Sequence, residues 1–341
     1  MVKIYFQSKK WIMACIAALA LGMAGCHSPK QLEDVAIVPQ PLSVEKGSGS
    51  FSFSGKTVIA VADDEQRIVA ENFASLFTKS AGFTPKVEKA KDGNIVFSID
   101  QSMKTDAYEL QITSDKITIK AADVKGFFYA LQNIRLMLPP AIEGQEHAAE
   151  TWAVPAVIIK DEPRFDYRGF MLDVSRYFLP KEDVIRMIDC ISMLKINRLH
   201  LHLTDDNGWR LEIKKYPRLT EVGAWKVDRQ NLPFPDRRKP ATVGGFYTQE
   251  DMKEIIRYAA ERQVEIIPEI DIPAHSNAAL ASYPEYACPV VKDFIGVLPG
   301  LGGKNAEIIF CAGNDKTFTF LQDILDEVIA LFPSRYINLG G

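Results

Sequence analysis

Ionisable side chains gather in the second half of this 341-residue chain, directly after three short apolar runs. They are Asp173 and Arg176 after the first run, Asp205-Asp206-Asn207 after the second, and Glu269, Asp271 and His275 after the third. An arginine presents a rigid fork of donors, and a histidine held by a carboxylate can exchange a proton near neutral pH. We expect Asp271 to hold His275 in one tautomer. The pattern predicts one polar site with acid–base chemistry.

Each of these residues also has an ordinary interpretation when it is taken alone. An arginine after a strand is usually a surface cation, Asp-Asp-Asn-Gly is a turn composition, and a single histidine near a proline is usually structural or solvated. Their recurrence after successive strands is what favours a shared site.

The sequence gives little support for a metal centre or a covalent nucleophile. The plausible metal ligands are His200, His202, Asp205, Asp271 and His275. No His-Glu-x-x-His helix or other dedicated ligand spacing occurs, and no Gly-x-Ser-x-Gly elbow is present. We therefore expect neither a metal nor a cofactor.

A repeating βα framework is needed to bring these residues together. Strands are predicted at 170–174, 198–203, 264–267 and 336–339, with helices of 3.6-residue apolar spacing at 184–194, 252–259 and 321–328. Pro180 precedes the first helix, and Thr248 with Asp251 forms a capping box for the second. Four βα units fit a doubly wound sheet or the first half of a (β/α)8 TIM barrel. Because no glycine-rich phosphate or dinucleotide loop follows a strand, we favour the barrel, whose active site lies at the carboxyl ends of its strands.

The first half of the chain predicts a separate α+β accessory domain. Apolar β-type runs at 57–61, 94–99, 107–112 and 116–121 are interleaved with helical stretches at 66–80 and 125–138, and a tight turn at Asp115-Lys116 joins the last two runs. Nothing in this half gathers histidines, cysteines or paired carboxylates, so we expect a structural role. The predicted organisation is a signal peptide at 1–25, the accessory domain at 26–155 and an incomplete catalytic barrel at 160–341.

The N-terminal residues have the pattern of an export signal. Three lysines precede the fifteen uncharged residues from Trp11 to Gly25, a run too short for a comfortable membrane span of roughly 20 residues. The end of this signal, Met23-Ala24-Gly25-Cys26, resembles a bacterial lipobox, so Cys26 is the expected lipidation site; a signal cleaved without lipidation is the alternative. We expect the periplasm or cell surface as the location, with an outer-membrane lipid anchor.

The remaining cysteines lie in an exported, disulfide-permissive context. Cys190 falls on the apolar side of a predicted helix and is interpreted as a small core residue. Cys288 and Cys311 flank a glycine-rich loop, and we hypothesise that they form a disulfide. The formal net charge of −4 and the lack of an extended basic run argue against a nucleic-acid partner and favour a neutral ligand.

Several long motifs closely resemble glycoside hydrolase family 20. They are YRGFMLDVSRYFLP from Tyr167, NRLHLHLTDDNGWRLEIKKYPRLTEVGAW from Asn197, GGFYTQEDMKEII from Gly244, EIIPEIDIPAHS from Glu265 and the final RYINLGG from Arg335. The resemblance implies a retaining exo-β-N-acetylhexosaminidase that acts on terminal GlcNAc or GalNAc of a glycan. In this family the substrate's own 2-acetamido oxygen attacks C1 to form an oxazoline, an Asp orients that group and the adjacent Glu protonates the leaving oxygen.

By position, Arg176 resembles the family's arginine that holds sugar hydroxyls O3 and O4, and Asp205 resembles its pocket aspartate. His275 with Asp271 resembles the pair that tunes the protonation of the acid. Ala274 and Asn338 stand where the family usually has Gly and His. The expected Asp-Glu would follow Gly341, so we expect residues 1–341 by themselves to be inactive. The alternative function is a non-catalytic carbohydrate-binding lipoprotein.

Overall fold

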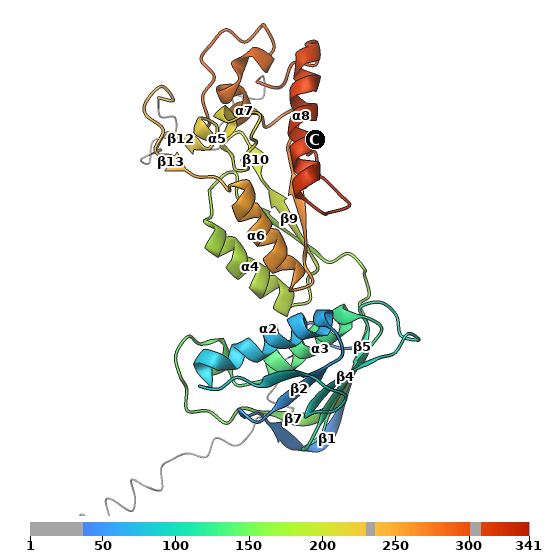
Figure 1. The fold of residues 1–341 in the computed structure, drawn as a ribbon. Coiled ribbons are helices and arrows are strands. Elements are labelled where there is room, and N and C mark those ends of the chain that lie inside the picture. Colours follow the sequence, from blue (N-terminus) through green and yellow to red (C-terminus); the bar gives the residue numbers. More distant parts are fainter. Residues whose placement is uncertain (1–36, 230–235, 301–307, 341) are drawn as a thin grey trace, which may run out of the picture. The chain divides into compact units, whose positions relative to one another are not determined.

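The computed structural model describes residues 37–229, 236–300 and 308–340. These residues form two compact units, the first ending at Glu162 and the second beginning at Pro163 (Figure 1). The predicted signal segment and Cys26 lie outside the described residues. Within the described ranges, no helix combines the length and apolar character needed to span a bilayer.

The first unit is a mixed sheet with two helices on one face (Figure 1). Strand order is β1-β7-β5-β6-β4-β2-β3. The strands are β1 (Ser43–Ser52), β2 (Val58–Val61), β3 (Lys86–Lys89), β4 (Ile95–Ile99), β5 (Tyr108–Ile112), β6 (Ile117–Ala121) and β7 (Ala153–Asp161), and the helices are α2 (Asp64–Ser80) and α3 (Val124–Met137), with a 3-10 turn η2 at Pro140–Glu143. Aromatic rings fill the core between helices and sheet, as in the Phe97–Phe127 stack with centroids 4.7 Å apart.

The predicted strands and helices of this unit are present, but its predicted boundary at Pro155 is wrong. Strand β7 continues to Asp161 and pairs antiparallel with both β1 and β5. The sequence did not predict this strand because it contains Pro155, and proline has no backbone N–H to donate to a neighbouring strand. The expected turn is confirmed by the antiparallel β5–β6 register, in which Ile112 faces Ile117.

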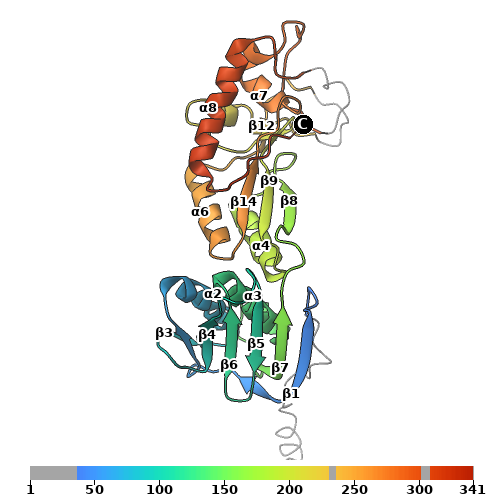
Figure 2. The same ribbon diagram turned by 90° about the vertical axis from the view of Figure 1, so that its right-hand side faces the viewer.

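The second unit contains a parallel three-stranded sheet in the order β14-β9-β8 (Figure 2). The strands are β8 (Gly169–Asp173), β9 (Arg198–His202) and β14 (Glu265–Glu269), and the main helices are α4 (Lys181–Met193), α6 (Gln249–Ala260) and α8 (Asp315–Leu331). Strands that follow one another in sequence are neighbours in space, as βα repeats of a barrel require. The predicted capping box of α6 is confirmed, with Thr248 and Asp251 bonded reciprocally.

Two predictions for this unit are wrong. The segment at 336–339 makes one parallel bridge, Asn338 with Glu269, and is not a strand. The carbonyl of Pro268 accepts from Asn338 N, but proline has no N–H with which to extend the ladder. Cys190 is exposed, because it falls off the buried stripe of α4 that Val184 and Ile188 define.

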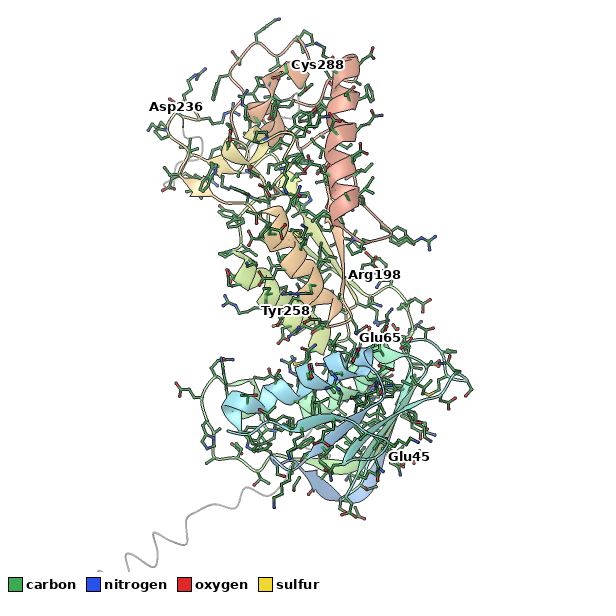
Figure 3. All side chains as sticks on the ribbon, viewed as in Figure 1. Glu45, Glu65, Arg198, Asp236, Tyr258 and Cys288 are labelled. Carbon is green, nitrogen blue, oxygen red and sulfur yellow. The ribbon has the colours of Figure 1, made fainter. Side chains whose placement is uncertain are left out.

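Short elements make up the loops that follow the strands. They are β10 (Thr204–Asp205), β11 (Gly208–Trp209), α5 (Arg218–Glu221), β12 (Trp225–Lys226), β13 (Val243–Gly244), α7 (Asn277–Ser282) and the 3-10 turn η3 (Pro284–Tyr286). Figure 3 shows that Arg198, at the start of β9, and Cys288, after η3, lie toward opposite ends of this unit. Figure 1 shows β10, β12, β13, α5 and α7 gathered at the carboxyl end of the sheet, where the polar residues were expected.

Candidate active site

A row of polar side chains crosses the carboxyl end of the parallel sheet. Strand β8 ends at Asp173, β9 at His202 and β14 at Glu269. The register pairs His202 with Asp173 on one side and with Glu269 on the other. Parallel strands in register thus bring three ionisable groups, far apart in the sequence, to one rim.

Arg176 lies over this rim and is held by two carboxylates. Its Nη1 donates to Asp173 Oδ2 at 2.8 Å, and its Nη2 forms an ion pair with Asp205 Oδ2 at 2.6 Å. The other oxygen of Asp173 accepts the backbone N–H groups of Ser175 and Arg176, which curls the loop around this carboxylate. The Arg176 side chain remains 32% exposed.

Asp205 is the buried centre of the cluster. Besides Arg176, it accepts from His202 Nε2 at 2.7 Å, and the opposite His202 nitrogen, Nδ1, lies 2.8 Å from Glu269 Oε2. Burial lowers the pKa of His202, but its two carboxylate partners outweigh burial and raise the pKa to about 9. Burial raises the pKa of Asp205, but the hydrogen bonds from His202 and the Asp206 N–H, with the charge of Arg176, lower it overall. At neutral pH His202 is therefore protonated and Asp205 is deprotonated.

His275 meets this cluster from the loop after β14, but its carboxylate partner is not the one expected. Its Nδ1 lies 3.2 Å from Asp205 Oδ1 and 3.4 Å from Asp206 Oδ2. Asp271 forms no described hydrogen bond or ion pair with His275, and its buried Oδ1 has no hydrogen-bond partner among the described residues. His275 ends the turn that separates it from Asp271, and its backbone there is left-handed with φ of 48°. The expected Asp271–His275 pair is thus replaced by Asp205–His275.

Asp271 nevertheless lies close to the cluster. One ligand-type atom from each of Asp205, Asp271 and His275 falls within 4.8 Å of the others. Burial raises the pKa of Asp271. The same spacing holds for His202, Glu269 and Asp271. Arg176 and His202 already offset the charge of Asp205, so we assign Asp205, His202 and Glu269 to an ion-paired network that Asp271 lies beside.

Three residues of the cluster were given no specific role by the sequence. Asp173 and Glu269 stood only among the ionisable groups that follow the strands, and His202 only among the plausible metal ligands. His202 and Glu269 bind one another inside the cluster, and Asp173 holds Arg176. His200 Nε2 also contacts Glu269, at 2.6 Å, and Asn338 Nδ2 lies 3.3 Å from the same nitrogen. The available signal was the alternation of histidine with leucine along β9, which places both imidazoles on one face of the strand.

The cysteines expected to form a disulfide are brought together as two free thiols. Ala287 and Phe310 form an antiparallel bridge, and the thiols of the next residues, Cys288 and Cys311, lie within hydrogen-bond reach of each other. The pKa of Cys288 is raised, mainly by a hydrogen bond with the Cys311 thiol and to a smaller extent by burial. The disulfide itself stays a prediction.

The fold is that of an α/β protein with an N-terminal domain and a second domain of parallel βα repeats, and its solved structural relatives imply a catalytic domain of the TIM-barrel type. Residues 165–341 match "Glycosyl hydrolase family 20, catalytic domain", and residues 34–162 match "Glycosyl hydrolase family 20, domain 2". The chain belongs to glycosyl hydrolase family 20.

Several named proteins are similar to this chain. A beta-hexosaminidase of Porphyromonas gingivalis is 38% identical over 96% of this chain and 42% of its own length. The N,N'-diacetylchitobiase of Vibrio harveyi is 36% identical over 72% of this chain and 28% of its own. A mutant Streptomyces plicatus beta-hexosaminidase solved with product GlcNAc superposes with a TM-score of 0.81 at 35% identity, covering 92% of this chain and 60% of that one. The chain spans less than two thirds of each.

Proposed function

We propose that residues 1–341 carry the accessory domain and the first half of the barrel of an exo-β-N-acetylhexosaminidase. The substrate would be a glycan with a terminal, non-reducing β-linked GlcNAc or GalNAc. Family membership and the names of the relatives support this class. The observation that carries the proposal is the Arg176–Asp205–His275 cluster, because it combines a sugar-binding fork with a carboxylate–imidazole pair.

The proposed reaction is retaining and substrate-assisted. The 2-acetamido oxygen attacks C1 while a glutamic acid protonates the departing glycosidic oxygen, so the C1–O bond breaks as the oxazoline forms. Water then opens the oxazoline at C1, giving up its proton to the same glutamate, and the anomeric configuration is kept. The protein supplies no nucleophile, and the proposal needs no metal or cofactor.

In this scheme, the described residues bind the sugar and tune the acid. The partly exposed Arg176 side chain would donate to two vicinal hydroxyls, while Asp173 and Asp205 hold its orientation. Asp205 stays ionised beside His275, and a fixed negative charge near the acid favours its protonated form. The protonated His202 stabilises Asp205 in that ionised state.

The deciding experiment compares two purified proteins on a chromogenic N-acetylglucosaminide and N-acetylgalactosaminide. One is residues 1–341, and the other is the product of the coding region read past codon 341. We expect the Asp-Glu pair after Gly341, turnover by the longer protein only, and none by residues 1–341. Turnover by residues 1–341 would contradict the assignment of the acid. Sugar binding without turnover in the longer protein would favour the carbohydrate-binding alternative.

We also propose that the protein is exported and anchored to the outer membrane through lipidated Cys26. The lysine-flanked apolar run and the Met23-Ala24-Gly25-Cys26 sequence support this proposal. The test is fractionation of intact cells that express wild type or Cys26→Ala. The wild type should sediment with membranes and the variant should be released, whereas a membrane-bound variant would refute the lipid anchor. Cys190→Ala serves as the matched control and should fractionate as wild type.

A further inference from the structure

A second arginine, Arg210, lies beneath the rim and contacts the loops that carry the proposed site. It follows β11 and is fully buried, with 0% of its surface exposed. Its backbone is bound on both sides, since its N–H donates to Leu203 O and its carbonyl accepts from Tyr247 N. The side chain is therefore held at a fixed point below the loops.

The guanidinium of Arg210 donates entirely to backbone carbonyls of four separate loop segments. These bonds are Nε to Val174 O (3.1 Å) and Ser175 O (3.2 Å), Nη2 to Ser175 O (2.6 Å) and Asn207 O (3.3 Å), and Nη1 to Ala224 O (2.6 Å) and Gly245 O (3.0 Å). Within the described ranges, every hydrogen-bond partner of this guanidinium is a backbone carbonyl. One cation thus joins loops that are far apart in the sequence.

A buried cation of this kind is costly unless many dipoles compensate it. Burial lowers the pKa of Arg210 to about 10, so the group still carries its charge at neutral pH. All three of its nitrogens are satisfied, which makes the arrangement specific to a forked donor; the ammonium group of a lysine is a point charge without that fork.

The segments that Arg210 joins are those that position the proposed sugar-binding residues. Val174 and Ser175 separate Asp173 from Arg176, and Asn207 belongs to the turn that begins at Asp205. Ser175 Oγ also donates to Gly208 O at 2.6 Å, linking the same two loops. Arg210 and Ser175 thus tie the loop that carries Arg176 to the loop that carries Asp205.

A second buried cation supports the same loop. Lys226 is 3% exposed, and its Nζ donates to the carbonyl of Arg176 at 2.6 Å while lying 4.2 Å from the centre of the Tyr177 ring. Gly208 shows how closely the loops fit around the guanidinium, because a Cβ at this position would overlap Arg210. The backbone of Gly208 is outside the left-handed region, so this overlap is the main obstacle to an alanine there.

We infer that Arg210 is a positioning residue, which fixes Arg176 and Asp205 in the geometry that grips the sugar. This inference rests on the proposed function and adds to it a residue that does not touch substrate. Because Arg176 would bind the sugar in both ground and transition states, loosening its loop should raise KM more than it lowers kcat.

The experiment measures kcat, KM and thermal stability for the full gene product and its Arg210→Lys and Gly208→Ala variants. Arg210→Lys keeps the charge and loses the fork. Gly208→Ala keeps the Arg210 guanidinium but displaces it, because the added Cβ would overlap it. It therefore tests the positioning role of Arg210 even if the lysine variant fails to fold. We expect each variant to raise KM by about tenfold with a smaller change in kcat. The KM of the double variant should be close to that of Arg210→Lys alone, because the alanine has its effect by displacing the arginine side chain.

The matched control is Ile324→Val on the buried face of α8, which should lower thermal stability and leave KM within about twofold. If KM stays within twofold of wild type in both Arg210→Lys and Gly208→Ala while stability falls, the positioning role is overturned and Arg210 is purely structural. Absence of turnover in the unmodified gene product would instead overturn the proposed function, and this inference with it.

Discussion

Asp205 Oδ1 lies 3.2 Å from His275 Nδ1, although the two residues follow different strands of the sheet. The same carboxylate binds Arg176 and His202 through its other oxygen. Asp205 therefore connects the sugar-holding cation with the imidazole proposed to tune the acid. Asp271 is four residues from His275 in the sequence and yet is not its partner.

The first prediction concerns the pH profile of kcat in the full gene product. Asp205→Asn removes a negative charge near the acid, so the pKa of the acid should fall and the alkaline limb should move to lower pH. His275→Ala should also shift the profile, because it removes the other member of the pair. Asp271→Asn is the matched control and should shift it less. An equal or larger shift of the pH profile in Asp271→Asn would show that Asp271, and not Asp205, is the carboxylate that acts with His275.

The second prediction concerns the pH dependence of stability in the second unit. His202 has a folded pKa of about 9, above its ordinary value of 6.5. Its contribution to the free energy of unfolding is therefore full below pH 6.5 and is lost as pH rises through about 9. Asp205 has a lowered pKa, so its contribution is present above its unfolded pKa and is lost in acid.

The measurement is urea unfolding followed by tryptophan fluorescence, with buried Trp209 as a reporter in the second unit. Between about pH 6 and about pH 9.5 the wild type should lose roughly 3 kcal/mol more than His202→Gln. His147→Gln, in the first unit, is the control and should keep the wild-type loss. A loss in His202→Gln as large as in wild type would remove His202 as its source.

The third prediction concerns sugar binding by Arg176. Arg176→Ala removes a charged donor fork, and hydrogen bonds to charged groups contribute about 1.5–3 kcal/mol each. KM in the full gene product should therefore rise by about ten- to a hundredfold. Arg176→Lys keeps the charge without the fork and should recover only part of the loss. An alanine variant with wild-type KM would exclude Arg176 from the sugar site.

The fourth prediction concerns Cys288 and Cys311. In an oxidising compartment their adjacent thiols should join, and closing a loop of this size stabilises by about 3 kcal/mol. Non-reducing peptide mapping should find the two peptides linked, and Cys288→Ser should lower the melting temperature. The exposed Cys190 supplies the control, because Cys190→Ser should change neither result. Complete alkylation of Cys288 and Cys311 without prior reduction would exclude the bond.

Local patterns were sufficient to predict most of the regular elements. The helices and the four strand runs of the first unit follow from apolar periodicity, and the α6 cap follows from Thr248 and Asp251. The exceptions were elements whose state depends on a distant partner. Strand β7 is fixed by pairing with β1 and β5, and the segment around Asn338 makes one bridge because Pro268 cannot extend the ladder.

The sequence by itself determined which chemical groups stand at the ends of the strands, because residue type and strand period are local properties. It also determined the family, through long motifs in a fixed order. Only the tertiary structure decided which of those groups bind one another. Asp205 rather than Asp271 meets His275, His202 links Asp205 to Glu269, and a buried Arg210 holds the loops from below. Such contacts depend on strand register and loop packing, which bring together side chains that spacing along the chain cannot pair.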